Sequence, residues 1–126
     1  MRKQYYFEPS PHGYYAWDVD RLIEKASRLP VIPIKLADIK ELDEDLAKQG
    51  TGQGNLTWRQ LADHMRLVEE ADLSYPILLS ADNRVMDGIH RIVKALLRGQ
   101  TTIQCKQFPE NPPADYVDVQ ETDLPY

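Results

Sequence analysis

The residues best suited to chemistry are concentrated in one stretch, residues 85 to 99, whose sequence is VMDGIHRIVKALLRG. Four ionisable side chains there are three or four residues apart and would share one face of an α-helix: Asp87, His90, Arg91 and Lys94. The first amide groups of a helix have no intrahelical acceptors and carry a partial positive charge, so anions bind there. Gly88, which has no Cβ, would let the backbone approach such an anion closely. We therefore predict an anion site, most simply for phosphate, at the start of this helix.

The two cations of the stretch, Arg91 and Lys94, would face the positive end of the helix dipole, so their presence favours a bound anion. Arg91 offers a planar fork to phosphate, and His90 can donate or transfer a proton near neutral pH. Asp87 would hold His90 or Arg91, or a divalent ion brought by a nucleotide. The candidate catalytic residues are thus Asp87 and His90. The candidate phosphate-binding residues are Gly88, Ile89, His90, Arg91 and Lys94.

The same spacing is also compatible with a purely structural role. Asp87 would then cap the helix and pair with Arg91 four residues later, while His90 would lie on a solvated face. Caps and ion pairs of this kind are common, so spacing alone leaves both interpretations open.

Hydrophobic periodicity predicts the elements around this stretch. We expect helices over residues 18–29, 38–50, 57–71 and 87–99, and strands over 31–39, 76–80, 84–86 and 101–108. Pro33 lacks an amide donor and indicates an edge strand, whereas Thr57 and Gln60 form a capping-box pattern. In the helix over 87–99, Asp87 is the expected N-cap, Gly99 the expected end, and the expected buried stripe is Ile89, Ile92, Val93 and Leu96.

These elements predict one mixed α/β domain, with a small mixed sheet and packed helices. It would occupy residues 18–108, between an aromatic arm over residues 1–17 and an acidic, proline-rich extension over residues 109–126. A length of 126 residues suits a single hydrophobic core. No apolar run is long enough to span a bilayer, and Cys105 is the only cysteine, so we expect a cytoplasmic protein without disulfide, metal site or membrane partner.

The net charge of −5 comes from the end of the chain. Residues 109–126 contain five acidic and no basic residues, and the other residues contain 15 of each kind. A formally neutral body lacks the basic field that dominates non-specific DNA affinity, which disfavours binding of an extended duplex.

The segments PILLS, VMDGIHR, IVKALLRG and TTIQCKQF, in this order, resemble the ParB/sulfiredoxin-like superfamily, which includes ParB-like nuclease domains. VIPIKLADI is similar to the strand that opens that domain, so the resemblance covers about residues 30 to 108. Members bind nucleotides at this turn: CTP in partition ParB, ATP in sulfiredoxin and ADP in a free-serine kinase. The resemblance thus implies nucleotide contact at Asp87, Gly88, His90 and Arg91.

Two departures limit what the resemblance implies. Ile89 stands where sulfiredoxin has its catalytic cysteine and partition ParB has a glutamate, and Cys105 is on the following strand. The motif is followed by an acidic segment and not by a basic helix-turn-helix domain. Neither sulfinic-acid reduction nor a complete ParB clamp on DNA is therefore expected.

Second contacts to the ligand are conceivable from the helix over 57–71, at Thr57, Arg59 or His64, and Trp17 or Trp58 could stack a base. The favoured function is binding of a phosphate-bearing ligand, foremost a nucleotide, with Mg²⁺ only as the nucleotide's companion. Hydrolysis, phosphoryl transfer and the oligomeric state are left open. The alternatives are a nucleic-acid-binding or nuclease module and a non-catalytic protein-interaction domain.

Overall fold

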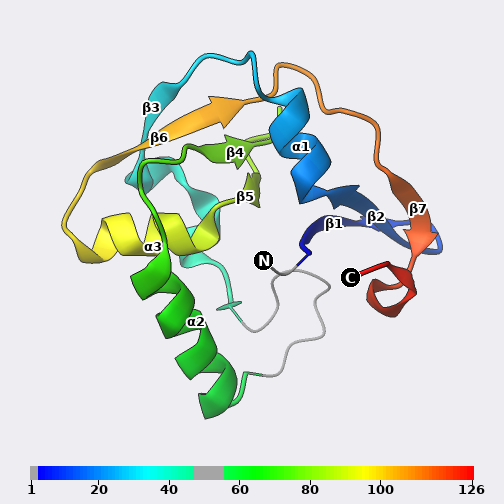
Figure 1. Cartoon of the computed structure of the whole chain (residues 1–126), viewed down its shortest axis with the longest axis horizontal. Helices are drawn as coiled ribbons and strands as arrows, with labels where there is room; N and C mark the ends of the chain where they lie inside the picture. Colours follow the sequence, from blue (N-terminus) through cyan, green and yellow to red (C-terminus); the bar gives the residue numbers. More distant parts are fainter. Residues whose placement is uncertain (1–2, 47–55) are drawn as a thin grey trace.

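The computed structural model describes residues 3–46 and 56–126 and shows the predicted mixed α/β fold (Figure 1). Its α-helices are α1 (Val19–Lys25), α2 (Trp58–Glu70) and α3 (Ile89–Leu97), and its short 3₁₀ helices are η1 (Leu36–Asp38), η2 (Lys40–Asp43) and η4 (Glu121–Asp123). Its strands are β1 (Tyr5–Ser10), β2 (Gly13–Asp18), β3 (Ile32–Lys35), β4 (Ile77–Leu79), β5 (Val85–Asp87), β6 (Thr102–Gln107) and β7 (Tyr116–Val119).

The larger sheet carries the motif stretch and has the strand order β3-β6-β4-β5. β4 and β5 form an antiparallel hairpin, while β6 runs parallel to β4 and antiparallel to β3. The chain passes from β4 to the parallel β6 through β5 and α3, so α3 packs on this sheet. Ile92 and Ala95 of α3 are fully buried against Ile77 and Cys105 of β4 and β6. β3 is an edge strand, as Pro33 predicted.

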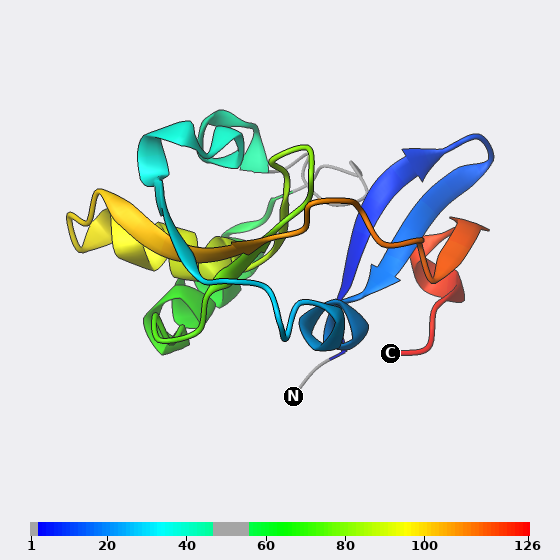
Figure 2. The same cartoon turned by 90° about the horizontal axis from the view of Figure 1, so that it is seen from above.

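The smaller sheet joins the two ends of the chain in the order β1-β2-β7. The segment expected to be an arm forms the β1–β2 hairpin, and the segment expected to be an extension supplies β7. Asp115, just before β7, accepts hydrogen bonds from the Asp18 amide at 2.8 Å and from Arg21 Nη1 at 3.0 Å. The Trp17 indole donates to the Pro112 carbonyl at 2.8 Å. Figure 2 shows this sheet on one side of α1 and the larger sheet on the other.

A second core cluster connects the two sheets through α1. It contains Trp17, Leu22, Ala26, Leu78, Met86 and Phe108. Because these residues come from both sheets and from α1, the terminal strands belong to the same packed body as the motif.

Two expectations about helices are wrong. The predicted helix over 38–50 is instead η1 and η2, because Ile39 takes an extended conformation between them and turns its side chain into the core, where it is 3% exposed. Residues 47–55, which include the end of this predicted helix, lie outside the described residues. In α3 the core-facing residue of the last turn is Ala95, and Leu96 is 50% exposed.

Other local predictions are confirmed. Thr57 Oγ1 accepts a hydrogen bond from the Gln60 amide, and Gln60 Oε1 accepts one from the Thr57 amide, which completes the capping box of α2. Gly99 has a left-handed φ of +73° just after α3. In the described part of the chain, none of the helices has the length and apolar character needed to cross a membrane.

The position of β7 predicts that residues 109–126 are needed for stability. Their removal deletes an edge strand and leaves the Trp17 indole and the Asp18 amide without their acceptors. We expect the free energy of unfolding to fall by about 3 kcal/mol or more, measured by urea titration of tryptophan fluorescence. Glu110→Gln, at an exposed position of the same segment, should leave it unchanged. Equal stability of the full and shortened chains would contradict this role of β7.

Candidate functional site

The turn between β5 and α3 is built around Gly88 and not around Asp87. Gly88 is the N-cap residue, with a left-handed φ of +114°, and Asp87 is the last residue of β5. The expectation that Asp87 caps α3 is therefore wrong, because the left-handed turn at Gly88 places one more residue between Asp87 and the helix. With glycine at the cap, α3 has no side-chain cap for the amide groups of its first turn.

Gly88 is required by packing against β4. A Cβ at this position would lie 2.6 Å from Ile77 Cγ2 and 2.9 Å from Ile77 Cβ. It would also lie 3.1 Å from Arg91 Nη2. The absence of a side chain therefore lets the turn rest directly on the buried strand, a reason that the motif alone did not reveal.

Arg91 fixes this turn through three hydrogen bonds. Its Nη2 donates to Asp87 Oδ2 at 2.7 Å, and its Nη1 donates to the carbonyls of Pro76 at 3.0 Å and Tyr75 at 3.2 Å. The side chains of Arg91 and Asp87 are only 14% and 17% exposed. The ion pair of the structural interpretation is thus present, and the guanidinium ties the α2–β4 connection to the start of α3. Sequence analysis did not find the two carbonyl partners, because no spacing signals them.

Lys94 bonds to the end of α2. Its Nζ donates to the carbonyls of Glu69 at 2.7 Å and Ala71 at 2.6 Å. The last carbonyls of a helix lack intrahelical donors and carry a partial negative charge, so a lysine stabilises them. Lys94 therefore serves the C-terminus of α2 and not the N-terminus of its own helix.

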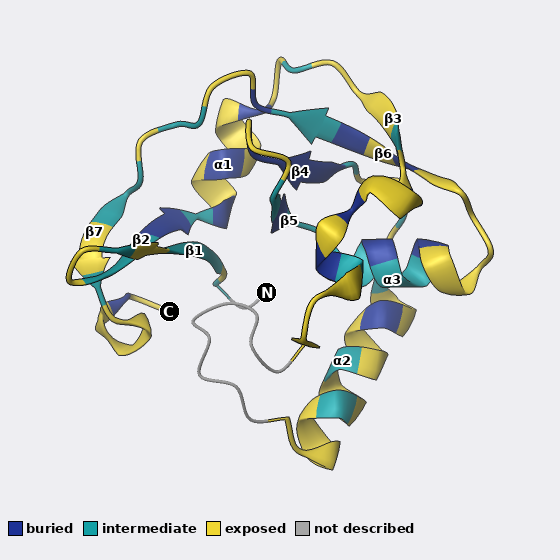
Figure 3. Cartoon of the chain, turned by 180° about the vertical axis from the view of Figure 1, so that it is seen from behind, coloured by how far each residue is buried: buried dark blue, intermediate teal, exposed yellow. Residues whose placement is uncertain are grey.

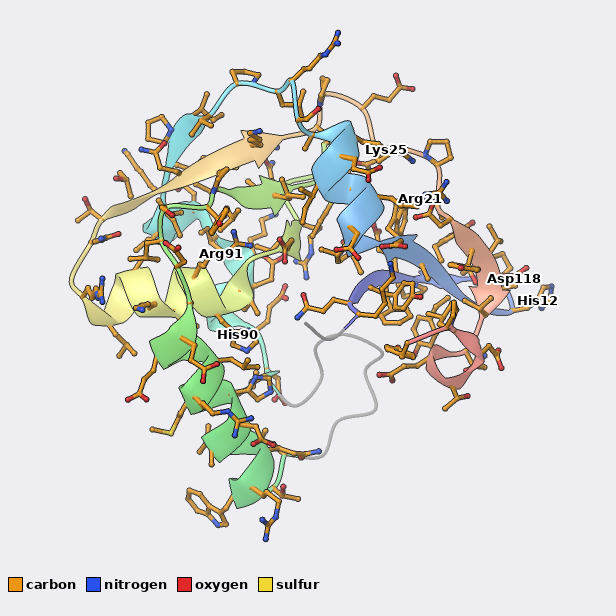
Figure 4. The ribbon with its side chains drawn as sticks, in the orientation of Figure 1. His12, Arg21, Lys25, His90, Arg91 and Asp118 are labelled. Carbon is orange, nitrogen blue, oxygen red and sulfur yellow. The ribbon has the colours of Figure 1, made fainter. Side chains whose placement is uncertain are left out.

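His90 is paired with His64 of α2, and this is the pair of chemically active side chains that the structure brings together. His64 Nδ1 and His90 Nε2 are 2.9 Å apart, which is a hydrogen bond in which one ring donates and the other accepts. Figure 4 shows His90 on the side of α3 toward α2, away from the sheet. The other two candidates, Thr57 and Arg59, are the N-cap residue of α2 and a residue of its first turn, and both lie at least one turn before His64.

The surroundings of His90 favour its neutral form. Burial is the main cause that lowers its pKa below 6.5, the neighbouring His64 lowers it further, and Asp87 acts in the opposite direction. At neutral pH the ring is therefore uncharged and can accept a proton.

Glu41 is a buried residue that helps to position β5. Its side chain is 8% exposed, and its Oε2 accepts a hydrogen bond from the Val85 amide at 2.6 Å. Arg84 Nε lies 3.5 Å from the same oxygen, and the Arg84 guanidinium also makes two hydrogen bonds to Glu44. The partners of Glu41 are more than 40 residues away, so no local spacing in the sequence indicates its role.

The remaining candidates lie apart from the turn or lack partners for chemistry. Cys105 is fully buried, and burial raises the pKa of its thiol to about 11, so it is protonated at neutral pH. Trp17 belongs to the core and is bonded to Pro112, whereas Trp58 is 86% exposed. Residues 3–46 and 56–126 contain no group of three or more His, Cys, Asp or Glu residues that could hold a metal ion.

Comparison of the chain with protein-family models, with curated proteins and with solved structures finds no match. The resemblance to the ParB/sulfiredoxin-like superfamily therefore depends on the motif and on the order of the elements, and it stays a prediction.

The turn geometry predicts different costs for the same substitution at two glycines. Gly88→Ala combines a left-handed backbone with overlap against Ile77, so we expect the free energy of unfolding to fall by about 3 kcal/mol or more. Gly99→Ala meets no atom within 4 Å and should lose only about 1 kcal/mol. Urea unfolding of both variants measures the difference. Equal losses would show that the contact with Ile77 is not tight.

The neutral state of His90 predicts a pH dependence of stability. In the unfolded chain, His90 binds a proton as the pH falls below 6.5. In the folded chain its lowered pKa means that the proton binds only at a lower pH, so acidification favours the unfolded chain and the free energy of unfolding decreases. We expect this decrease between about pH 7 and pH 5 in the wild type and a smaller one in His90→Gln. The same slope in His90→Gln would contradict the lowered pKa.

Proposed function

We propose that this protein binds a phosphate-bearing ligand, foremost a nucleotide, at the start of α3, with His90 and His64 facing the phosphate. The observation that carries the proposal is the His64–His90 pair beside a helix N-terminus that has no side-chain cap. The amide groups of Ile89 and His90 would be the backbone donors to the phosphate, and the two rings would be the side-chain donors.

Protonation makes the pair suited to an anion. In the ligand-free protein the rings share one hydrogen bond, and burial and repulsion disfavour a charge on His90. A phosphate beside the rings would favour the charged form of each, because an opposite charge within a few ångströms raises a histidine pKa. Both rings would then donate to the phosphate, so binding would take up protons.

Arg91 and Asp87 would act as positioning residues in this proposal. The motif predicted that Arg91 contacts the phosphate, but the two terminal nitrogens of Arg91 are bonded to Asp87 and to two carbonyls. Arg91 also neutralises the Asp87 carboxylate, so this acidic side chain would repel an incoming anion less. Lys94 is not included among the phosphate contacts, because its amine is bonded at the end of α2.

Nucleotides are the favoured class because the motif and the order of its elements resemble a nucleotide-binding superfamily. Mg²⁺ would enter with the nucleotide phosphates, since it is commonly held by phosphates, waters and one or two carboxylates. For hydrolysis or phosphoryl transfer, the neutral His90 would be the proton acceptor. Asp87 is less suited to that role, because Arg91 binds its carboxylate.

Calorimetric titration tests the proposal with ATP, ADP and CTP, each with Mg²⁺, and with inorganic phosphate. We expect saturable binding to the wild type and to His12→Gln. His90→Ala and His64→Gln should bind about tenfold more weakly or worse, since each loses a charged donor. Titration at pH 7 in two buffers of different ionisation enthalpy should reveal proton uptake.

Thermal unfolding of each variant controls for loss of the fold. Absence of binding by the folded wild type to all four compounds would exclude the proposed function. Undiminished binding by both folded histidine variants would place the ligand elsewhere on the protein.

A further inference from the structure

Helix α2 has a large exposed side. It packs on α3, and Val68 is the only buried residue among its 13, with Leu61 and His64 half-buried on the same side. Figure 3 shows the remaining surface of the helix as mostly exposed. Trp58 is 86% exposed and Met65 61% exposed on this helix. Large apolar side chains that gather on a surface are typical of an interaction site.

The exposed side consists of two neighbouring rows of residues three or four apart, which lie next to each other along a helix. The first row, called the apolar row here, is Trp58, Ala62 and Met65. The second, called the charged row, is Arg59, Asp63, Arg66 and Glu70. All seven residues are exposed, and Arg66 and Asp63 form an ion pair within the helix at 3.4 Å.

The charged row is complementary to itself in the antiparallel direction. When two copies of α2 are related by a twofold axis perpendicular to them, the same row of each copy meets the other. Arg59 of one copy then lies opposite Glu70 of the other, and Asp63 lies opposite Arg66. The twofold axis repeats both pairs, so each of the four charges meets an opposite charge.

The apolar row fits the same arrangement. In the register that pairs the charged row, Ala62 of one copy lies within about 3 Å of Met65 of the other along the helix axis, so a small side chain packs beside a large one, as close packing of two helices requires. Ala62 and Met65 thus have suitable counterparts in a second copy of the same chain, whereas Trp58 lies beside the exposed Glu69 of that copy.

We propose that the protein forms a homodimer in which two α2 helices pack antiparallel through the apolar and charged rows. This proposal is independent of ligand binding at α3. A helix of 13 residues is roughly 20 Å long, and such a contact is smaller than the roughly 800 Å² per partner of standard interfaces. The dimer is therefore expected to be weak and to depend on concentration and salt.

Charge reversal tests the arrangement. We expect sedimentation velocity of the full chain to show a monomer–dimer equilibrium between about 1 µM and about 1 mM protein. Arg59→Glu and Glu70→Arg each turn two attractive pairs into two repulsive ones, so each should weaken the dimer about tenfold or more. The double variant Arg59→Glu/Glu70→Arg restores both pairs with reversed signs and should dimerise within a few-fold of the wild type.

Two features make these variants informative. A negative charge in the first turn and a positive charge in the last turn both favour the helix dipole, so neither variant should lose the helix, which circular dichroism checks. Arg28→Glu, at an exposed position outside α2, makes the same change of net charge as Arg59→Glu and should leave the dimer intact. A wild-type chain that stays monomeric, a dimer that tolerates both single reversals, or a double variant that does not recover would each overturn the proposal.

Discussion

The hydrogen bonds of Arg91 are the constraint on which the rest of the motif depends. One guanidinium group joins the carboxylate at the end of β5 to two carbonyls of the α2–β4 connection. A charge that is 14% exposed is costly to desolvate unless it is paired and hydrogen-bonded, and here it is both. Because these bonds fix the turn, Gly88 rests on Ile77 and His90 is directed toward α2.

This arrangement changes how the charges of the motif should be understood. Four ionisable residues on one helix face suggested that cations gather around an anion. In the structure Arg91 is neutralised by Asp87, and Lys94 stabilises the end of a different helix. His90 is the residue of the motif whose pKa the structure changes, since burial lowers it. The electrostatics of the candidate site would thus depend on protons more than on fixed cations.

Local signals explain which parts of the structure could be predicted from the sequence. The capping box at Thr57, the left-handed Gly99 and the missing amide of Pro33 each act within a few residues, and each prediction is confirmed. The mixed α/β class followed from the same periodic segments.

The unpredicted features depend on contacts between distant residues. Asp87 and Arg91 are four residues apart whether Asp87 is the N-cap of the helix or the last residue of a strand. Only the left-handed turn at Gly88 distinguishes these two structures. The acceptors of Lys94 are 23 and 25 residues away. The terminal strands pair across about 100 residues, in segments whose prolines and glycine are typical of irregular structure.

The attachment of α2 connects the candidate site to the proposed interface. The C-terminal half of this helix is held by the burial of Val68 and by Lys94, which bonds to its final carbonyls. Farther toward its N-terminus, the hydrogen bond between His64 and His90 holds the helix, with Leu61 half-buried beside it. The first turn carries Trp58 and Arg59, both exposed, so its position relative to the body follows from the contacts one turn later.

Separation of the two rings, by protonation or by a phosphate between them, would remove the polar contact nearest to the apolar and charged rows. Chemistry at His90 and association through α2 would therefore both depend on the hydrogen bond between His64 and His90.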